Sequence, residues 1–160
     1  HGSWIIEARE TGRTYRGHFN RRNNGVIKNL PPDCVVEAPG WVDRFGIHMM
    51  DGIELPLACA ATCNVSVQVQ RMSKEAAVRG DVTLLKQAML HDPLVGAVCD
   101  PEEVWQMTDE MLVAQAPWLP QFASAVEGAR SRLAAHERDG TRVSLRQWEG
   151  AARLETRTVE

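Results

Sequence analysis

The sequence lacks a G-x-G-x-x-G segment, a long apolar run and a basic stripe. Without the first, it has no phosphate-binding turn of the dinucleotide-binding type. Without the second, it contains nothing that approaches the roughly 20 apolar residues of a membrane span. Eighteen basic and twenty-one acidic residues are interspersed and give a formal net charge of -3, which argues against nucleic acid as a partner. These absences favour a globular cytoplasmic protein that binds neither nucleic acid nor a membrane.

The residue types that usually form catalytic or metal sites are few or poorly spaced. Cys59 and Cys63 would share a helical face, but they have no second cysteine pair or nearby histidine to complete a zinc site. We expect them to be small buried hydrophobes in a reducing compartment. The single tyrosine, Tyr15, lies in a polar stretch with no recognisable motif around it. The sequence therefore predicts no catalytic, cofactor-binding or metal-binding residue within this chain.

A chain of 160 residues is long enough for one domain, which would bury roughly 70% of the surface exposed by the unfolded chain. We expect a single domain over residues 1–160, with a loosely packed tail at 137–160. Alternation of apolar and polar residues at 154–159 favours a terminal strand, or a tail that becomes ordered only in a dimer. The predicted fold class is α+β, mostly helical with a small mixed or antiparallel sheet.

Helical periodicity is clearest from Leu55 onward. Apolar and small residues recur there at steps of three and four up to Ala76, and no charged residue occurs between Glu54 and Arg71. This pattern predicts a core helix that is buried on most sides and ends near Gly80.

Helix-capping signals mark the elements that follow. Asp81 is the expected N-cap of a short amphipathic helix that ends at His91–Pro93. Asp100, followed by proline and two glutamates, predicts a capping box and a helix to about residue 116. A further amphipathic helix is expected from Phe122 to His136, with a turn at Asp139–Gly140.

The stretch from Phe19 to Asp43 concentrates the polar signals of the chain. Asn24-Gly25 readily adopts positive φ, and Pro31-Pro32 forces an extended path, so a polar loop of fixed shape is expected. A short strand at 34–38 should follow, with Cys34, Val36 and Ala38 on one face and Pro39 ending it.

This stretch resembles glycoside hydrolase family 4, whose members use NAD and a divalent metal. The family pattern N-x-x-N-x-G-x-I-x-N-L-P followed by V-E-x-P is matched by Asn20, Asn23, Gly25, Ile27, Asn29, Leu30, Pro31, Val36, Glu37 and Pro39. Gly46-Ile47, Leu55-Pro56, Ala88 and Asp92-Pro93 also agree. The resemblance covers about residues 18–122, and it departs from the family at Met49 and Gly52.

The resemblance implies that the chain is the C-terminal part of a glycosidase with a lactate dehydrogenase-like fold. The missing N-terminal half would supply NAD binding, a divalent metal such as Mn²⁺ and the catalytic tyrosine, so the chain alone should be inactive. A homodimer or homotetramer is expected for the parent. The carbohydrate substrate would be contacted by Asn20, Asn23, Asn29, Arg21, Arg22 and His18, since amides suit neutral hydroxyls and arginine suits a carboxylate. The expected substrate is an α-galacturonide, then an α-glucoside, then a phosphorylated disaccharide.

Two other classes of protein remain open. One is the substrate domain of a 2-hydroxy acid dehydrogenase of the lactate or malate type, although its clamping arginine and histidine base have no matching segment here. The other is a non-catalytic helical interaction module. The asparagines of the loop also have a structural alternative, in which they satisfy the backbone of their own turn.

Overall fold

The computed structural model describes residues 1–143. By their internal contacts these residues form two compact units, His1–Met72 and the described residues from Ser73 onward, and the single domain expected over 1–160 stays a prediction. The described part is mostly helical with one three-stranded antiparallel sheet, which confirms the predicted fold class. The terminal strand proposed at 154–159 lies outside the described residues.

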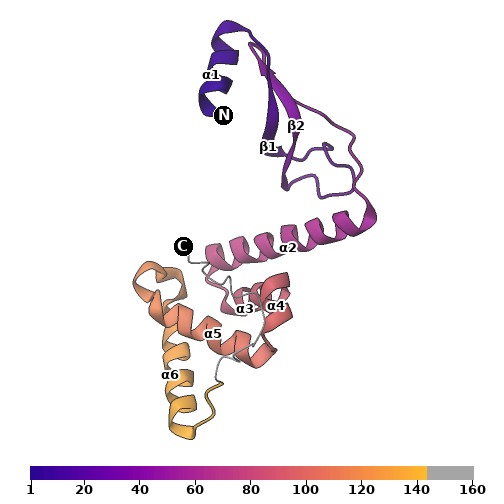
Figure 1. Cartoon of the computed structure of the whole chain (residues 1–160). Helices are drawn as coiled ribbons and strands as arrows, with labels where there is room; N and C mark the ends of the chain where they lie inside the picture. The colour runs from indigo at the N-terminus through magenta and orange to yellow at the C-terminus, as the bar shows by residue number, and fades with distance from the viewer. Residues whose placement is uncertain (144–160) are drawn as a thin grey trace, which may run out of the picture. The chain divides into compact units, whose positions relative to one another are not determined.

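The first unit contains a helix and the whole sheet (Figure 1). Helix α1 (Gly2–Thr11) is followed by β1 (Tyr15–Arg22), β2 (Val35–Asp43) and β3 (Gly46–Met49), in the spatial order β1-β2-β3. Ala8 of α1 packs with Phe19 of β1 and Val42 of β2. This contact anchors α1 on one face of the sheet.

The register gives the sheet two different faces. Phe19, Val36, Ala38 and Val42 occupy one face and are buried. Side chains of alternate residues point to opposite faces, so Arg16, His18, Asn20 and Arg22 of β1 share the other face, and all four are exposed. The predicted strand at 34–38 is confirmed by this burial, whereas β1 was not foreseen.

Pro39 does not end the strand, contrary to the sequence-based prediction. It lies opposite His18 within β2, and its carbonyl accepts a hydrogen bond from the Met50 amide at 3.0 Å. The N and C=O of one strand residue point to the same side, and on that side β3 ends at Met49. The N–H that proline lacks would point past the end of β3, so its absence does not interrupt the pairing of β2 with β1.

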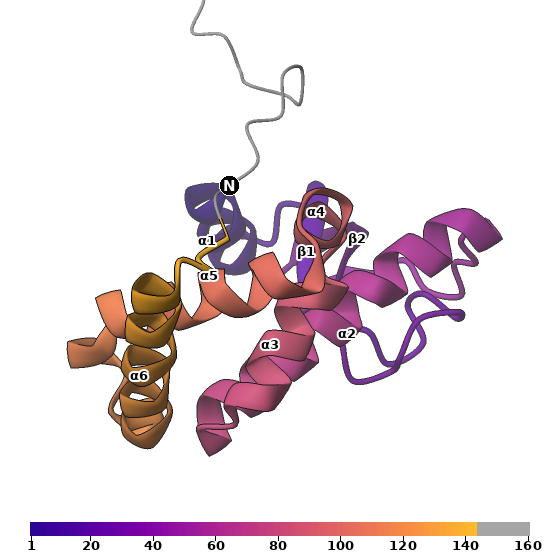
Figure 2. The same cartoon turned by 90° about the horizontal axis from the view of Figure 1, so that it is seen from below.

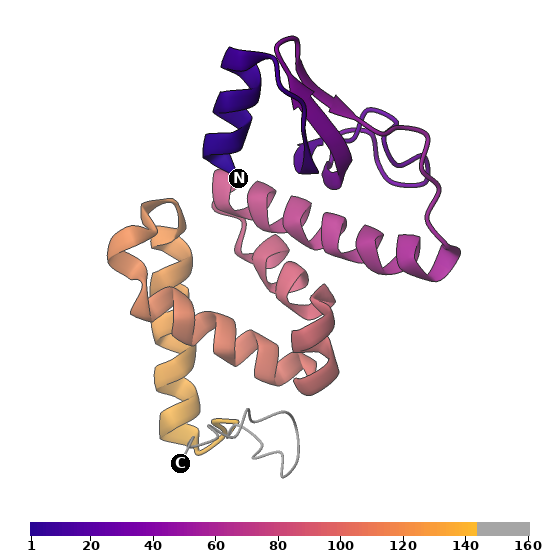
Figure 3. The same cartoon turned by 45° about the horizontal axis from the view of Figure 1, so that its top comes forward.

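Helix α2 (Leu57–Arg79) starts two residues later than predicted and is not the buried core helix expected. Every residue from 57 to 66 except Ala60 is exposed. Ala60 is buried, and Val67 packs on the cluster formed by Val26, Ile27, Leu30, Cys34, Val36 and Ala38. In the first unit the hairpin and its loops lie on one side of α2 (Figure 3), so the prediction was wrong because only one narrow face of the helix is covered.

The second unit consists of helices (Figure 2). They are α3 (Val82–His91), α4 (Pro93–Val98), α5 (Pro101–Ala114) and α6 (Ala123–Asp139), with two short 3-10 turns at Ala116–Trp118 and Pro120–Phe122. Leu112, Phe122 and Val126 form the core between α5 and α6.

Local capping chemistry sets these helix starts. Asp81 accepts a hydrogen bond from the Leu84 amide at 2.9 Å, and Asp100 with Glu103 forms the capping box, as predicted. The sequence reading missed α4, which begins at Pro93 with Asp92 as its N-cap. Within residues 1–143 no helix has the length and apolar content needed to cross a membrane.

Candidate functional site

The polar loop that joins β1 to β2 is organised around Asn23. Its side chain is fully buried, and its amide nitrogen lies within 3.0 Å of the carbonyl oxygens of Ile27, Leu30 and Pro31. Its amide oxygen accepts the Ile27 N–H at 2.7 Å. Two amide protons shared among three carbonyls leave Asn23 without a free donor, so this side chain holds the loop in shape.

Asn29 fixes the same loop to a distant segment. Its side chain donates to the Leu55 carbonyl at 2.8 Å and accepts the Leu55 N–H at 3.1 Å. Next to it, the Lys28 amide donates to the Ile53 carbonyl at 2.8 Å. Asn24 and Gly25 have φ values of 40° and 94°, which confirms the expected turn. The loop and the residues just before α2 therefore form one connected structure.

The open face of the sheet gathers three of the predicted sugar-contacting residues. His18, Asn20 and Arg22 lie at alternate positions of β1, opposite Pro39, Glu37 and Val35. Directly opposed residues of an antiparallel pair have Cβ atoms about 5 Å apart, so the Asn20 amide and the Glu37 carboxylate stand side by side. Both are exposed, and together they offer hydrogen-bond donors and acceptors of the kind that sugar hydroxyls require.

An aromatic pair lies at the far end of this face. The rings of Trp41 and His48 stack with centroids 5.1 Å apart and planes inclined by 14°. His48 Nε2 lies 3.0 Å from Asp43 Oδ1. This hydrogen bond from His48, together with one from the Phe45 amide, lowers the pKa of the Asp43 carboxyl. The sequence reading had not connected Trp41 with His48, because only the β2–β3 register brings them together.

The other residues predicted to contact the sugar make hydrogen bonds to the backbone. Arg21 points to the side of the sheet opposite Asn20, and its guanidinium donates to the Ile47 carbonyl at 3.0 Å. The amides of Asn23 and Asn29 are engaged with backbone groups, as in the structural alternative considered above. A sugar contact through Arg21, Asn23 or Asn29 stays a prediction.

Tyr15 and the cysteines contribute to packing or to the surface. The Tyr15 hydroxyl is hydrogen-bonded to His1 Nδ1, and its ring packs edge-on against Phe19. Burial raises the pKa of the Cys34 thiol. Cys59 and Cys63 are exposed, so the expectation that they are buried was wrong. Residues 1–143 contain no group of three His, Cys, Asp or Glu side chains positioned to hold a metal ion.

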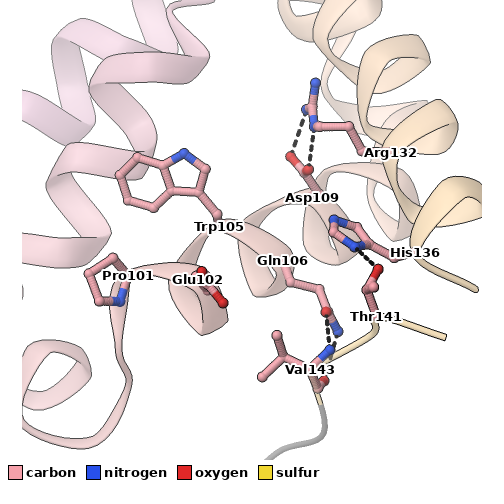
Figure 4. A pocket seen from close by; sticks show the side chains of 9 residues that line it. All are labelled: Pro101, Glu102, Trp105, Gln106, Asp109, Arg132, His136, Thr141 and Val143. Atoms are coloured by element: carbon pink, nitrogen blue, oxygen red, sulfur yellow. Dashed lines mark hydrogen bonds and ion pairs between the residues drawn. The ribbon is translucent and has the colours of Figure 1, made fainter. Parts of the chain in front are cut away.

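A cavity of about 580 Å³ lies in the second unit, between α5 and α6 (Figure 4). Asp109 is one of its lining residues and is buried. It pairs with the Lys86 ammonium at 2.8 Å and with Arg132 through two hydrogen bonds of 2.7 and 2.9 Å. Burial would raise the pKa of Asp109, but the hydrogen bonds from Arg132 and Lys86 outweigh it and the pKa is lowered. Hydrogen bonding to Asp109 in turn raises the pKa of the Arg132 guanidinium.

Other groups of this cavity tie the chain beyond α6 to α5. The Gln106 side chain accepts the Val143 N–H at 2.8 Å and donates to the Val143 carbonyl at 3.0 Å. His136 bonds Thr141 at 2.9 Å. Because these polar groups satisfy one another, we assign the cavity a structural role rather than a catalytic one.

Comparison of the sequence with known protein families identifies the family of this chain. Residues 1–95 match the model of the family 4 glycosyl hydrolase C-terminal domain. The chain belongs to glycosyl hydrolase family 4. The match contains the sheet, the polar loop, α2 and α3, and it ends before the cavity between α5 and α6.

Curated family 4 relatives are longer than this chain. An α-galactosidase of Rhizobium meliloti (strain 1021) is 64% identical over 160 residues, which is all of this chain and 32% of that protein. An α-galactosidase of Bacillus subtilis (strain 168) is 35% identical over 76% of this chain and 28% of its own length. The chain therefore spans about a third or less of these relatives.

Solved structures of the family share the fold. A 6-phospho-β-glucosidase from Thermotoga maritima, solved with manganese, NAD⁺ and glucose-6-phosphate, superposes with a TM-score of 0.65 at 26% identity. The superposition covers 74% of this chain and 28% of that one. Family membership leaves the dehydrogenase and interaction-module alternatives without support.

Proposed function

We propose that this chain is the sugar-facing C-terminal part of an NAD- and metal-dependent glycosidase that acts on α-linked galactosides. The observation that carries the proposal is the 64% identity with an α-galactosidase along all 160 residues. The second α-galactosidase, from Bacillus subtilis, supports the same sugar. These relatives favour a neutral galactoside over the α-galacturonide that the arginines of the loop had suggested, so we propose the galactoside in its place.

The cofactors would be held outside this chain. The NAD⁺ and manganese named for the Thermotoga maritima structure support a similar pair in the parent, where they would supply redox chemistry at the sugar carbon. The residues described here do not fit either group, since they contain no metal-binding cluster and the sequence has no glycine-rich dinucleotide turn. The task left to this chain is to bind and orient the sugar, in a protein that we place in the cytoplasm.

Binding would use the open face of the sheet beside the polar loop. Asn20 and Glu37 can donate to and accept from neighbouring hydroxyls, and His18 and Arg22 flank them on the same strand. Asn23 and Asn29 would act indirectly, because their hydrogen bonds to the backbone fix the loop at the end of β1. A site built on a strand and a rigid loop keeps its geometry without reorganising when the substrate binds.

The test is the substrate preference of the full-length parent. We expect kcat/KM to be at least about tenfold higher for an aryl α-galactoside than for the α-glucoside, the α-galacturonide or a 6-phosphorylated glycoside, a difference of about 1.4 kcal/mol. A preference for any of the other three sugars would overturn the galactoside assignment.

Two substitutions test the site itself. Asn20→Ala and Arg22→Ala should each lower kcat/KM about tenfold or more, with unchanged thermal stability because both side chains are exposed. Arg16→Ala is the matched control, since Arg16 is exposed on the same face of β1 but about 20 Å away along the strand. If Arg16→Ala and Arg22→Ala changed kcat/KM equally, the open face of the sheet would not be part of the substrate site.

A further inference from the structure

The register of the sheet places a large aromatic side chain on its open face. Trp41 of β2 lies opposite His48 of β3 on one side and opposite Arg16 of β1 on the other. Trp41 is 40% exposed. A single exposed apolar residue needs no explanation by itself, but Trp41 differs because neighbouring side chains fix its ring.

Three contacts hold the Trp41 ring in one orientation. The ring stacks on the His48 imidazole, and His48 Nε2 is hydrogen-bonded to the Asp43 carboxylate at 3.0 Å. The same carboxylate oxygen accepts a hydrogen bond from the Phe45 amide at 2.8 Å, which connects the aromatic pair to the turn between β2 and β3. Because the ring is already ordered, a ligand that packs on it loses little side-chain entropy on binding.

The second face of the indole is turned away from His48, on the side of β1. The two rings are nearly parallel with centroids 5.1 Å apart, close to the separation of about 4.8 Å between neighbouring strands. Since β2 lies between β3 and β1, the two rings stand side by side above adjacent strands, and His48 uses one indole face. Among residues 1–143 no other aromatic ring and no cation stacks on Trp41. Within the first unit this second face is therefore open to a ligand.

Trp41 lies beyond the galactose position of the proposed sugar site. It follows Glu37 by four positions of β2, which corresponds to about 13 Å along the strand. A single pyranose ring is shorter than this, so a galactose held by Asn20 and Glu37 would not reach Trp41. Sugar units joined to the galactose would reach it across Pro39 and His18, which lie opposite each other between the two positions.

We propose that Trp41 forms a second sugar subsite, on which a sugar unit attached to the galactose stacks. The inference deepens the proposed function and rests on it to the extent that the open face binds the galactose. One side of a pyranose ring carries mainly C–H groups, and their hydrogens are attracted to the electron-rich face of an indole. His18 is a diagonal neighbour of Trp41 and within its reach, so its imidazole can bond hydroxyls at the rim of the same sugar unit. These polar neighbours favour a sugar over an apolar group as the occupant.

The test compares two substrates of one protein. In the full-length parent, kcat/KM is measured for raffinose, a trisaccharide α-galactoside, and for methyl α-galactoside, which carries only a methyl group beyond the galactose. Trp41→Leu keeps an apolar side chain but removes the aromatic face, and it should lower the ratio of kcat/KM for raffinose to that for methyl α-galactoside about tenfold. Both values come from the same preparation, so the fraction of folded enzyme cancels in the ratio.

Matched variants separate the aromatic face from other effects. Trp41→Phe keeps an aromatic face and should keep the ratio within about threefold of the unchanged parent. Trp118→Ala is the control, since Trp118 is 75% exposed and belongs to the second unit, and it should leave the ratio unchanged.

His48 is a positioning residue, because it acts on the sugar only through the Trp41 ring. His48→Ala removes the stacking partner and should lower the ratio about threefold, whereas His48→Phe can stack again and should restore it. In the variants with a lower ratio, KM for raffinose should rise while kcat stays unchanged. The reason is that stacking on a sugar unit remote from the reaction stabilises the bound substrate and the transition state alike.

An unchanged ratio in Trp41→Leu would overturn the proposal. Equal losses on raffinose and methyl α-galactoside would also overturn it, because Trp41 would then serve the galactose itself or the folding of the sheet. If Asn20→Ala and Arg22→Ala weaken methyl α-galactoside cleavage while Trp41→Leu leaves the ratio unchanged, only this inference fails. If the parent prefers another sugar, the galactoside assignment fails, and the same ratio measured with an oligosaccharide and the methyl glycoside of that sugar still tests Trp41.

Discussion

Replacing Asp109 by alanine should destabilise the helical unit by about 4 kcal/mol. The Asp109 side chain is 5% exposed and that of Lys86 is 8% exposed. The substitution would leave a buried ammonium without its counter-charge, and breaking a buried ion pair in this way costs about 3–5 kcal/mol. Arg132 is 47% exposed, so its guanidinium can return to water and adds less than about 1 kcal/mol.

The assay is urea denaturation of the 160-residue chain, followed by circular dichroism. With a slope of about 2 kcal/mol per molar urea, the midpoint should fall by about 2 M. Arg132→Ala should cost only about 1–2 kcal/mol, because Asp109 keeps its bond to Lys86. Glu127→Ala removes a surface ion pair with Arg130 and should change stability by less than about 0.5 kcal/mol.

A double substitution identifies the cause of the loss. Lys86→Met combined with Asp109→Leu removes both buried charges while keeping apolar volume, and it should return most of the stability lost in Asp109→Ala. The reasoning fails if Asp109→Ala costs no more than Arg132→Ala. It also fails if the double variant is as unstable as Asp109→Ala, since the loss would then reflect packing and not an unpaired charge.

Three further predictions concern pH and the first unit. The pKa of Asp109 is lowered on folding, so its contribution to the free energy of unfolding is present above about pH 4 and is lost as the pH falls through the folded pKa. Between pH 7, 5 and 3 the urea midpoint should therefore fall less steeply for Asp109→Asn than for the unchanged chain. The same dependence of the midpoint on pH in both proteins would contradict this. Asn23→Ala should cost about 3 kcal/mol in urea denaturation, because it leaves buried backbone groups unpaired, and a loss below about 1 kcal/mol would argue against its role in the loop. Gly40→Ala should also destabilise the chain, because a Cβ there would collide with the His48 carbonyl oxygen. A loss of about 2 kcal/mol in the free energy of unfolding should lower the melting temperature by several degrees. Gly25→Ala is the comparison: its Cβ would meet no atom within 4 Å, but the φ of 94° is strained for alanine, so it tests backbone strain without the collision.

The starts of two helices could be predicted from the sequence because they depend on capping by nearby side chains. The capping residues Asp81 and Asp100 act on backbone N–H groups two to three residues away, so their effect needs no knowledge of the rest of the fold. The turn at Asn24-Gly25 was readable for the same reason, because positive φ is a property of those residues. The family pattern of asparagines and prolines lies in this locally determined part.

The pairing of residues between the strands could not be predicted from the sequence in this way. β1 carries Gly17 and Arg21 on the same side as buried Phe19, which blurs the alternation that identifies a strand. Only the register brings Asn20 beside Glu37 and Trp41 beside His48. Likewise Asp109 and Arg132, 23 residues apart, meet only because α5 and α6 pack together.

From the sequence we could predict that residues 57–70 form an uncharged helical stretch with a periodic stripe, and that a polar loop of fixed shape precedes it. The folded first unit shows which face of α2 packs on its hydrophobic cluster and which asparagine amides are bonded to the backbone. Periodicity records that a face is apolar, but it does not identify what lies against that face. Likewise, an asparagine has the same hydrogen-bonding capacity in a turn or a sugar site, and its partners depend on segments such as Leu55, which is 26 positions from Asn29.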